Sequence, residues 1–257
     1  MADPNHTAVL GAGVIGASWT ALFLAAGKSV AIYDVADDVE RTVRAYVENA
    51  WPTLTELGMT DRGNPEAVTF HVKPVDAVDR AAFVQESVPE RVAAKHALYA
   101  EIEDALAPDA VIASSASGLT LSEMQAGWRD PARLVLGHPF NPPHLIPLVE
   151  VMGNDRTADG VVETAERFYQ DVGKVTIRVN KEVPGHVANR LQAASRRPTS
   201  PPSATRCCSA FSRRPRRKTD HESSVSCYQE CDPSDAFNPS IGRTSKQKKV
   251  PAEAIRG

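Results

Sequence analysis

The sequence predicts an α/β fold with a doubly wound, mostly parallel sheet. Two observations carry this expectation. Short apolar runs alternate with longer stretches of helical spacing over the first 194 residues. A glycine-rich turn, GAGVIG, separates the first apolar run from the first helical stretch. The remaining residues, 195–257, lack this alternation, so we expect the sheet to be complete before them.

The expected strands and helices follow one another along the chain. The strand candidates are short apolar runs, at 7–10, 29–33, 68–72, 81–84, 111–113, 134–136, 148–152 and 174–179. The helix candidates have apolar residues at three- and four-residue spacing, at 14–26, 39–57, 90–106 and 158–172. Parallel strands need long crossover connections, so strands separated by helices of this length favour parallel pairing.

The GAGVIG turn directly follows the first expected strand and opens the first helix. Gly11 allows a tight turn, Gly13 lets the backbone approach a pyrophosphate, and Gly16 allows close contact between helix and strand. The first-turn residues Val14 and Ile15 would then face the phosphates with their amides. This context predicts a Rossmann-type dinucleotide site rather than an ordinary glycine-rich turn.

Asp34 ends the second expected strand, 18 positions after Gly16. A carboxylate at this position can bind the ribose hydroxyls of a dinucleotide and would repel a 2′-phosphate. No Arg or Lys follows within six residues. We therefore expect the cofactor to be NAD rather than NADP.

A histidine and a glutamate twelve positions apart form a candidate catalytic pair. His138 follows an apolar run and precedes three prolines in five positions, which restrict the backbone. Glu150 lies inside the apolar run 148–152, where an unpaired carboxylate would be costly. Such a pair would orient the imidazole and make it a better base for a hydroxyl proton. The spacing is equally compatible with a structural histidine and a glutamate satisfied by the backbone.

Six motifs stand in the order in which they occur in one enzyme family. They are GAGVIG, QESVPE, SSASGL, GHPFNPP, PLVEV and PGHVANRL. Through them, residues 6–194 resemble the 3-hydroxyacyl-CoA dehydrogenase family. The wording of QESVPER and NPPHLIPLVE is most similar to its subgroup of L-carnitine and L-gulonate 3-dehydrogenases. The resemblance implies NAD-dependent, reversible oxidation of a C3 hydroxyl to a 3-oxo acid.

The resemblance also implies roles for individual residues around the reacting carbon. His138 matches the catalytic base and Glu150 its carboxylate partner. Ser117 matches a serine that hydrogen-bonds the reacting oxygen, and Asn189 matches an asparagine on the substrate carbonyl side. Ser117 is also compatible with a simple turn residue.

On the cofactor side, Glu90 and Lys95 match positions near the nicotinamide ribose and the substrate mouth. Lys95 is also compatible with a solvated helix lysine, and Glu86 with a strand-end carboxylate that has no role. No metal site is expected, because the cysteines do not follow a paired CxxC spacing.

The segment after the second strand bears on the substrate. In CoA-using members of the family this segment carries lysines that meet the CoA phosphates. Here residues 35–64 hold six acidic residues, three arginines and no lysine. Such a surface would repel a phosphate-rich handle, so we expect a small free 3-hydroxy acid, carnitine-like, as the substrate. Two alternatives stay open: a 3-hydroxyacyl-CoA such as 3-hydroxybutyryl-CoA, and an NAD-binding protein with impaired catalysis.

The formal net charge of −3 is a cancellation between two unlike parts of the chain. Residues 1–194 carry 16 basic and 26 acidic residues, whereas residues 195–257 carry 13 and 6. The second part also holds 11 Ser, 7 Pro and all four cysteines, and has no Leu, Met or Trp. So few large apolar side chains cannot offset the entropy of ordering the backbone, and we expect this tail to be disordered.

Three explanations of the tail compete: a basic segment that binds nucleic acid or lipid, a cysteine metal site, and sequence from a shifted reading frame or retained intron. We favour the third, because Pro198, Pro201 and Pro202 interrupt a helix that starts at PGHVANRLQAA. The expected organisation is an NAD-binding domain at 1–183, the start of a helical second domain at 184–194 and the tail at 195–257. In the family that second domain makes the homodimer and closes the cleft. We therefore expect the dimer interface to be lost and turnover to be reduced.

Composition gives the remaining expectations. The chain is 42% hydrophobic and has no run of 18 apolar residues and no visible signal peptide. We therefore expect a cytoplasmic protein with a small-molecule substrate and with neither a membrane nor a nucleic acid as partner.

Overall fold

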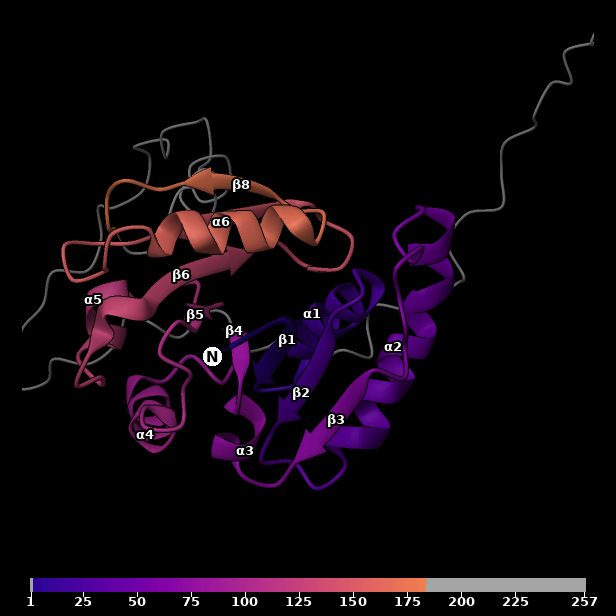
Figure 1. Ribbon diagram of the computed structural model, residues 1–257, viewed down its shortest axis with the longest axis horizontal. Helices are drawn as coiled ribbons and strands as arrows, with labels where there is room; N and C mark the ends of the chain where they lie inside the picture. The colour runs from indigo at the N-terminus through magenta and orange to yellow at the C-terminus, as the bar shows by residue number, and fades with distance from the viewer. Residues whose placement is uncertain (1, 184–257) are drawn as a thin grey trace, which may run out of the picture. The chain divides into compact units, whose positions relative to one another are not determined.

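The computed structural model describes residues 2–183, which form an eight-stranded sheet with helices on both faces (Figure 1). The strands are β1 Asp3–Leu10, β2 Ser29–Tyr33, β3 Val68–His71, β4 Ala81–Glu86, β5 Val111–Ser114, β6 Leu134–Pro139, β7 Leu148–Met152 and β8 Val175–Arg178. The helices are α1 Val14–Ala25, α2 Val39–Glu56, α3 Pro74–Val78, α4 Val92–Ile102, α5 Leu121–Gln125 and α6 Val161–Asp171, with a 3₁₀ turn at Pro131–Arg133. Asn189, the expected start of a second domain and the expected tail lie outside the described residues.

The sheet has the order β3-β2-β1-β4-β5-β6-β7-β8. Every neighbouring pair is parallel except β6 and β7, which are antiparallel. The prediction of a doubly wound, mostly parallel sheet is therefore confirmed. The strand order reverses between β1 and β4, and in such sheets ligands bind in the crevice beyond the carboxyl ends of the strands at this point.

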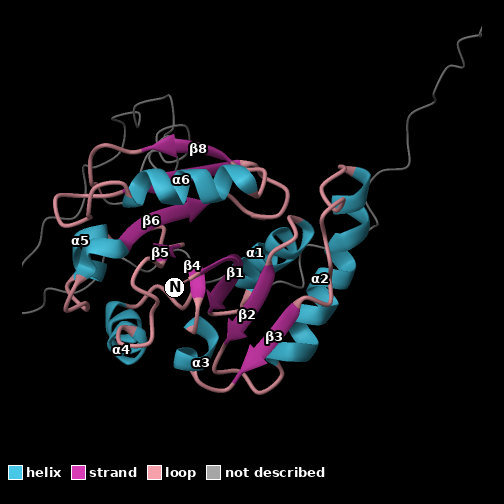
Figure 2. Ribbon diagram, in the orientation of Figure 1, coloured by secondary structure: helices cyan, strands magenta, loops and turns pink. Residues whose placement is uncertain are grey.

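Side chains alternate between two apolar layers along each central strand. In β1, Val9 belongs to the apolar cluster that includes residues of α1, α2 and α6, whereas Ala8 and Leu10 belong to the cluster that includes residues of α3, α4 and α5. Figure 2 shows these helices on the two sides of the strands. The short apolar runs of the sequence are explained by this double burial, because both faces of the sheet are covered.

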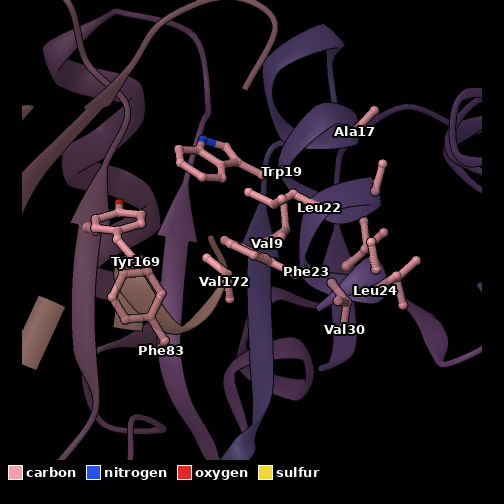
Figure 3. Close-up of a cluster of buried hydrophobic side chains, with 14 of the residues drawn as sticks. Val9, Ala17, Trp19, Leu22, Phe23, Leu24, Val30, Phe83, Tyr169 and Val172 are labelled. Carbon is pink, nitrogen blue, oxygen red and sulfur yellow. The ribbon is translucent and has the colours of Figure 1, made fainter. Parts of the chain in front are cut away.

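Aromatic side chains fill the layer under α1 and α6 (Figure 3). Trp19 and Phe23 of α1 stack with a centroid separation of 5.3 Å, and Tyr169 of α6 lies 5.5 Å from Trp19. Phe83 of β4 stacks on Phe168 at 3.7 Å. These contacts fix α1 and α6 against the middle of the sheet, where the strand order reverses.

The differences from the sequence expectation have local causes. The helices α3 and α5 were not predicted, because five residues are too few to show a helical period. A capping box at Thr120 and Glu123 was nevertheless a readable start signal for α5. The helix expected at 90–106 is only Val92–Ile102. The residues on either side of this helix make other contacts. Before it, Glu90 binds the loop after β5, and after it, Glu103 accepts hydrogen bonds from the amides of residues 129 and 130.

Within residues 2–183, no helix has both the length and the apolar character needed to cross a membrane.

Gly16 tests the close contact between α1 and the glycine turn. A Cβ at Gly16 would lie 1.9 Å from the carbonyl oxygen of Gly11, a backbone atom that cannot move aside cheaply. We expect Gly16→Ala to lower the free energy of unfolding by about 1–3 kcal/mol in urea titrations followed by circular dichroism. Gly13→Ala is the matched control, because a Cβ there meets no described atom within 4 Å. Equal stability of the two variants would contradict this account of the turn.

Candidate active site

The glycine turn joins β1 to α1 at the point where the strand order reverses. Gly11 has φ +86°, and a Cβ on it would lie 2.6 Å from the backbone nitrogen of Val88. Gly13 caps α1 without a side-chain hydrogen bond, and the first turn of the helix contains no acidic residue. The amides at Val14 and Ile15 and the open space at Gly13 therefore form a cradle that suits a phosphate group.

Asp34 lies just beyond the end of β2, beside this turn. Its Oδ2 accepts a hydrogen bond from the amide of Ala12 at 2.6 Å, and its Oδ1 accepts one from the amide of Ala36 at 2.9 Å. The carboxylate is thus tied to the glycine turn at the position where the adenosine ribose of a dinucleotide would lie. The residues present fit NAD.

A pocket of about 220 Å³ opens beyond the carboxyl ends of the strands. Its lining includes Ile15 from the glycine turn, Glu90 and Lys95 from the segment after β4, Ser117 after β5, and His138 near the end of β6. Five residues expected from sequence to bind cofactor or substrate therefore line a single cavity.

His138 and Glu150 lie opposite each other across the antiparallel strands β6 and β7. The Nδ1 atom of His138 lies 2.8 Å from Oε2 of Glu150. His138 is 7% exposed and Glu150 1% exposed. A neutral imidazole held this way carries its proton on Nδ1 and accepts through Nε2. The structure thus brings together the two residues whose pairing the sequence left open.

Glu90 and Ser117, two separately predicted site residues, bind each other. Oε2 of Glu90 accepts the Ser117 hydroxyl at 2.9 Å, and Oε1 accepts the amides of Ser117, Gly118 and Leu119. Burial alone would raise the pKa of Glu90, but these hydrogen bonds hold the pKa below its ordinary value. Glu90 therefore clamps the loop after β5 as a charged wall of the pocket.

Lys95 is buried rather than solvated. Its Nζ lies 2.6 Å from Oε1 of Glu86, and the two residues are 1% and 0% exposed. Oε2 of Glu86 accepts hydrogen bonds from Tyr99 at 2.8 Å and Ser114 at 2.7 Å. Burial and the charge of Glu86 raise the pKa of Tyr99. The alternative of a solvated Lys95 is therefore wrong, whereas Glu86 does end a strand and serves there as the buried partner of Lys95.

The loop between β6 and β7, which connects His138 to Glu150, is held by side chains outside the loop. The Nζ of Lys174 donates to the carbonyl oxygens of Pro143 and of Ile146, and lies 5.1 Å from the ring centroid of Trp19. The imidazole of His144 in the same loop is bound through Nδ1 to the Ser18 hydroxyl at 2.8 Å. These contacts hold the loop against α1, so the loop that joins the two catalytic candidates is fixed in place.

Residues 6–183 match the 3-hydroxyacyl-CoA dehydrogenase, NAD binding domain. The fold and the site therefore define a class of protein: dehydrogenases whose NAD-binding domain has this architecture. The chain belongs to the 3-hydroxyacyl-CoA dehydrogenase family, as its motifs indicated, and the matched residues form its NAD-binding domain.

Individual proteins support the same assignment. The chain is 51% identical over 190 residues to an L-carnitine dehydrogenase of Streptomyces coelicolor, covering 74% of the chain and 60% of that relative. It is 46% identical over 192 residues to an L-carnitine dehydrogenase of Streptomyces griseus, covering 75% and 57%. The solved structure of 5-formyl-3-hydroxy-2-methylpyridine 4-carboxylic acid 5-dehydrogenase, described as an NAD⁺-dependent dismutase, matches with a TM-score of 0.70 and 33% identity. That match covers 76% of the chain and 63% of that structure. The chain spans less than two thirds of the length of these relatives.

The buried Lys174, which holds the loop between β6 and β7, should make the stability of the protein depend on pH. Burial lowers the pKa of this lysine from 10.5 to about 8. The cost of burying the ammonium is fully present below pH 8 and is relieved as the pH rises toward 10.5. We expect this group to add up to about 3 kcal/mol to the free energy of unfolding over that range. The neutral amine still has donors for both carbonyls.

The measurement is urea unfolding at about pH 7.5, 8.5 and 9.5 for the wild type and Lys174→Met. The variant has no titrating group at this position, so its stability should rise less with pH than that of the wild type. Identical pH slopes for the two proteins would contradict the proposed burial cost.

Proposed function

We propose that this chain carries the cofactor half of an NAD-dependent dehydrogenase that oxidises the C3 hydroxyl of a small 3-hydroxy acid to the 3-oxo acid. The observation that carries the proposal is the buried pair of His138 and Glu150, with 2.8 Å between Nδ1 and Oε2, beside a pocket that reaches the glycine turn. Bound NAD would supply the hydride acceptor. The protein supplies the base and the geometry.

His138 acts as the general base in this proposal. Nε2 takes the proton of the substrate hydroxyl, and the Glu150 carboxylate stabilises the imidazolium that forms. This pairing also gives Glu150 the partner it needs. An ionised carboxylate that is only 1% exposed is costly without a charged or hydrogen-bonding partner.

The remaining site residues are assigned by position. Glu90 and Lys95 would meet the nicotinamide ribose and the mouth of the substrate site. Ser117 would bind the reacting oxygen, for which its hydroxyl hydrogen must turn from Glu90 toward the substrate. Asn189 lies outside the described residues, and its role beside the substrate carbonyl stays a prediction.

The charges around α2 bear on which substrate the site takes. All three arginines of residues 35–64 are ion-paired: Arg41 with Asp38, Arg44 with Glu40 and Glu66, and Arg62 with Asp171. The segment contains no lysine, so it offers the phosphates of a CoA handle no unneutralised cation. Together with the L-carnitine dehydrogenases among its relatives, this favours a small free acid, and we infer L-carnitine.

The test is reduction of NAD, followed by NADH absorbance, with L-carnitine, L-gulonate, 3-hydroxybutyrate and 3-hydroxybutyryl-CoA. We expect L-carnitine to give the highest kcat/KM of the four compounds. His138→Asn should abolish turnover while NADH still binds, because the change removes the base and leaves the glycine turn intact. A higher kcat/KM with the CoA thioester would overturn the substrate assignment. NADH binding without oxidation of any of the four compounds would instead support the impaired NAD-binding protein.

Glu150→Gln tests the orienting role of the carboxylate. The amide keeps the shape of the side chain but removes the charge that stabilises the imidazolium. We expect kcat to fall by about 10²- to 10⁴-fold, with KM changed much less and NADH affinity unchanged. A kcat within threefold of the wild type would contradict a paired base.

A further inference from the structure

Two serines that line the pocket belong to a chain of polar groups that the proposed chemistry does not use. Ser87 follows β4 and Ser115 follows β5, and their hydroxyl oxygens lie 2.9 Å apart. The Ser115 oxygen also lies 3.2 Å from the indole Nε1 of Trp19 and 3.0 Å from Nε2 of Gln85. The direction of each hydrogen bond in this chain can be derived from the groups behind it.

The orientation of the Gln85 amide is fixed by its neighbours. Nε2 lies 3.1 Å from the carbonyl oxygen of Ala113, which only accepts hydrogen bonds, so this atom is the donor. Oε1 accepts the hydroxyl of Tyr169 at 2.8 Å. Burial raises the pKa of Tyr169, so the phenol keeps its proton. In Figure 3 the Tyr169 oxygen and the Trp19 nitrogen both lie toward the arrowhead ends of the strands. Ser87 and Ser115 directly follow the ends of β4 and β5.

The donors at Ser115 determine the direction of the serine pair. A hydroxyl oxygen has two acceptor positions, and Trp19 and Gln85 occupy both with groups that donate only. The Ser115 hydrogen is therefore the one that points to Ser87. Within residues 2–183, the Ser87 hydroxyl makes no hydrogen bond other than the one with Ser115. The Ser87 hydrogen is thus left for a ligand in the pocket.

Ser87 lies on the cofactor side of the pocket. Its amide donates to the carbonyl of Leu10 at 2.7 Å. Its carbonyl carbon lies only 2.7 Å from where a Cβ on Gly11 would be. The loop therefore packs directly on the glycine turn, in line with the path of a dinucleotide from its phosphates toward His138. The reactive end of NAD is a nicotinamide whose carboxamide oxygen is an obligate acceptor.

We infer that the Ser87 hydroxyl is a specificity-determining donor that binds the carboxamide oxygen of the nicotinamide, with its direction set by Trp19, Gln85 and Ser115. The inference rests on the NAD site of the proposed function but requires neither the assigned substrate nor His138 as base.

The test compares NADH with ADP-ribose, which keeps both riboses and both phosphates but lacks the nicotinamide. Calorimetry on the full 257-residue chain, without substrate, gives Kd for each ligand. We expect Ser87→Ala to weaken NADH by about 3- to 10-fold, the effect of one neutral hydrogen bond, and to leave ADP-ribose unchanged. Ser87→Thr keeps a hydroxyl and should retain most of the NADH affinity.

Trp19→Phe tests the direction of the serine pair. It removes the indole donor and frees one acceptor position on Ser115, to which Ser87 can then donate. We expect a smaller loss of NADH affinity than in Ser87→Ala, again with ADP-ribose unchanged, so that a general packing defect is recognised by its effect on both ligands.

Three results would overturn the inference: an unchanged NADH Kd in Ser87→Ala, equal weakening of NADH and ADP-ribose in that variant, or a wild type that binds ADP-ribose as tightly as NADH. A wild type that prefers NADH and loses that preference in Ser87→Ala supports the inference even where L-carnitine is not oxidised. Failure of the proposed substrate and failure of this inference are therefore distinguishable.

Discussion

The carboxylate of Glu150 is buried in the middle of β7, and its need for a partner constrains the end of the sheet that carries the pocket. The antiparallel pairing of β6 with β7 puts His138 directly opposite it. The eight residues between these strands leave no room for the long crossover that parallel pairing requires. A short connection, anchored by Lys174 and Ser18, therefore fixes the register that joins the imidazole to the carboxylate. The imidazole is oriented by the backbone of two strands rather than by a flexible loop.

The rest of the pocket is built in the same way, from polar groups at the carboxyl ends of β4 and β5. Glu86 holds Lys95, Glu90 holds the loop at Ser117, and Gln85 holds Ser115. Each is a charge or dipole fixed before any ligand arrives, which reduces the reorganisation needed when charge develops during a reaction. These buried networks also explain why the central strands carry polar residues at positions that otherwise belong to the core.

Much of this arrangement was predictable because it depends on local patterns. The glycine turn with Asp34, the eight strands and the candidate pair of His138 and Glu150 all follow from apolar periodicity and from residues that are costly to bury unpaired. The pairing of Glu86 with Lys95 and the Ser87–Ser115 chain were missed because they join separate elements. Their partners come from β4, α4, β5, α1 and α6, and no spacing along the chain indicates which of them meet. The short helices α3 and α5 were missed for lack of length.

The central claim is that Glu150 fixes the tautomer of His138 so that Nε2 faces the substrate. Nitrogen-15 NMR of the histidine ring at alkaline pH measures this directly, with His138→Asn to assign the signal. The account predicts a protonated Nδ1 and an unprotonated Nε2 in the wild type. A His138 ring protonated on Nε2 would contradict it, because the nitrogen assigned as the base would already carry a proton.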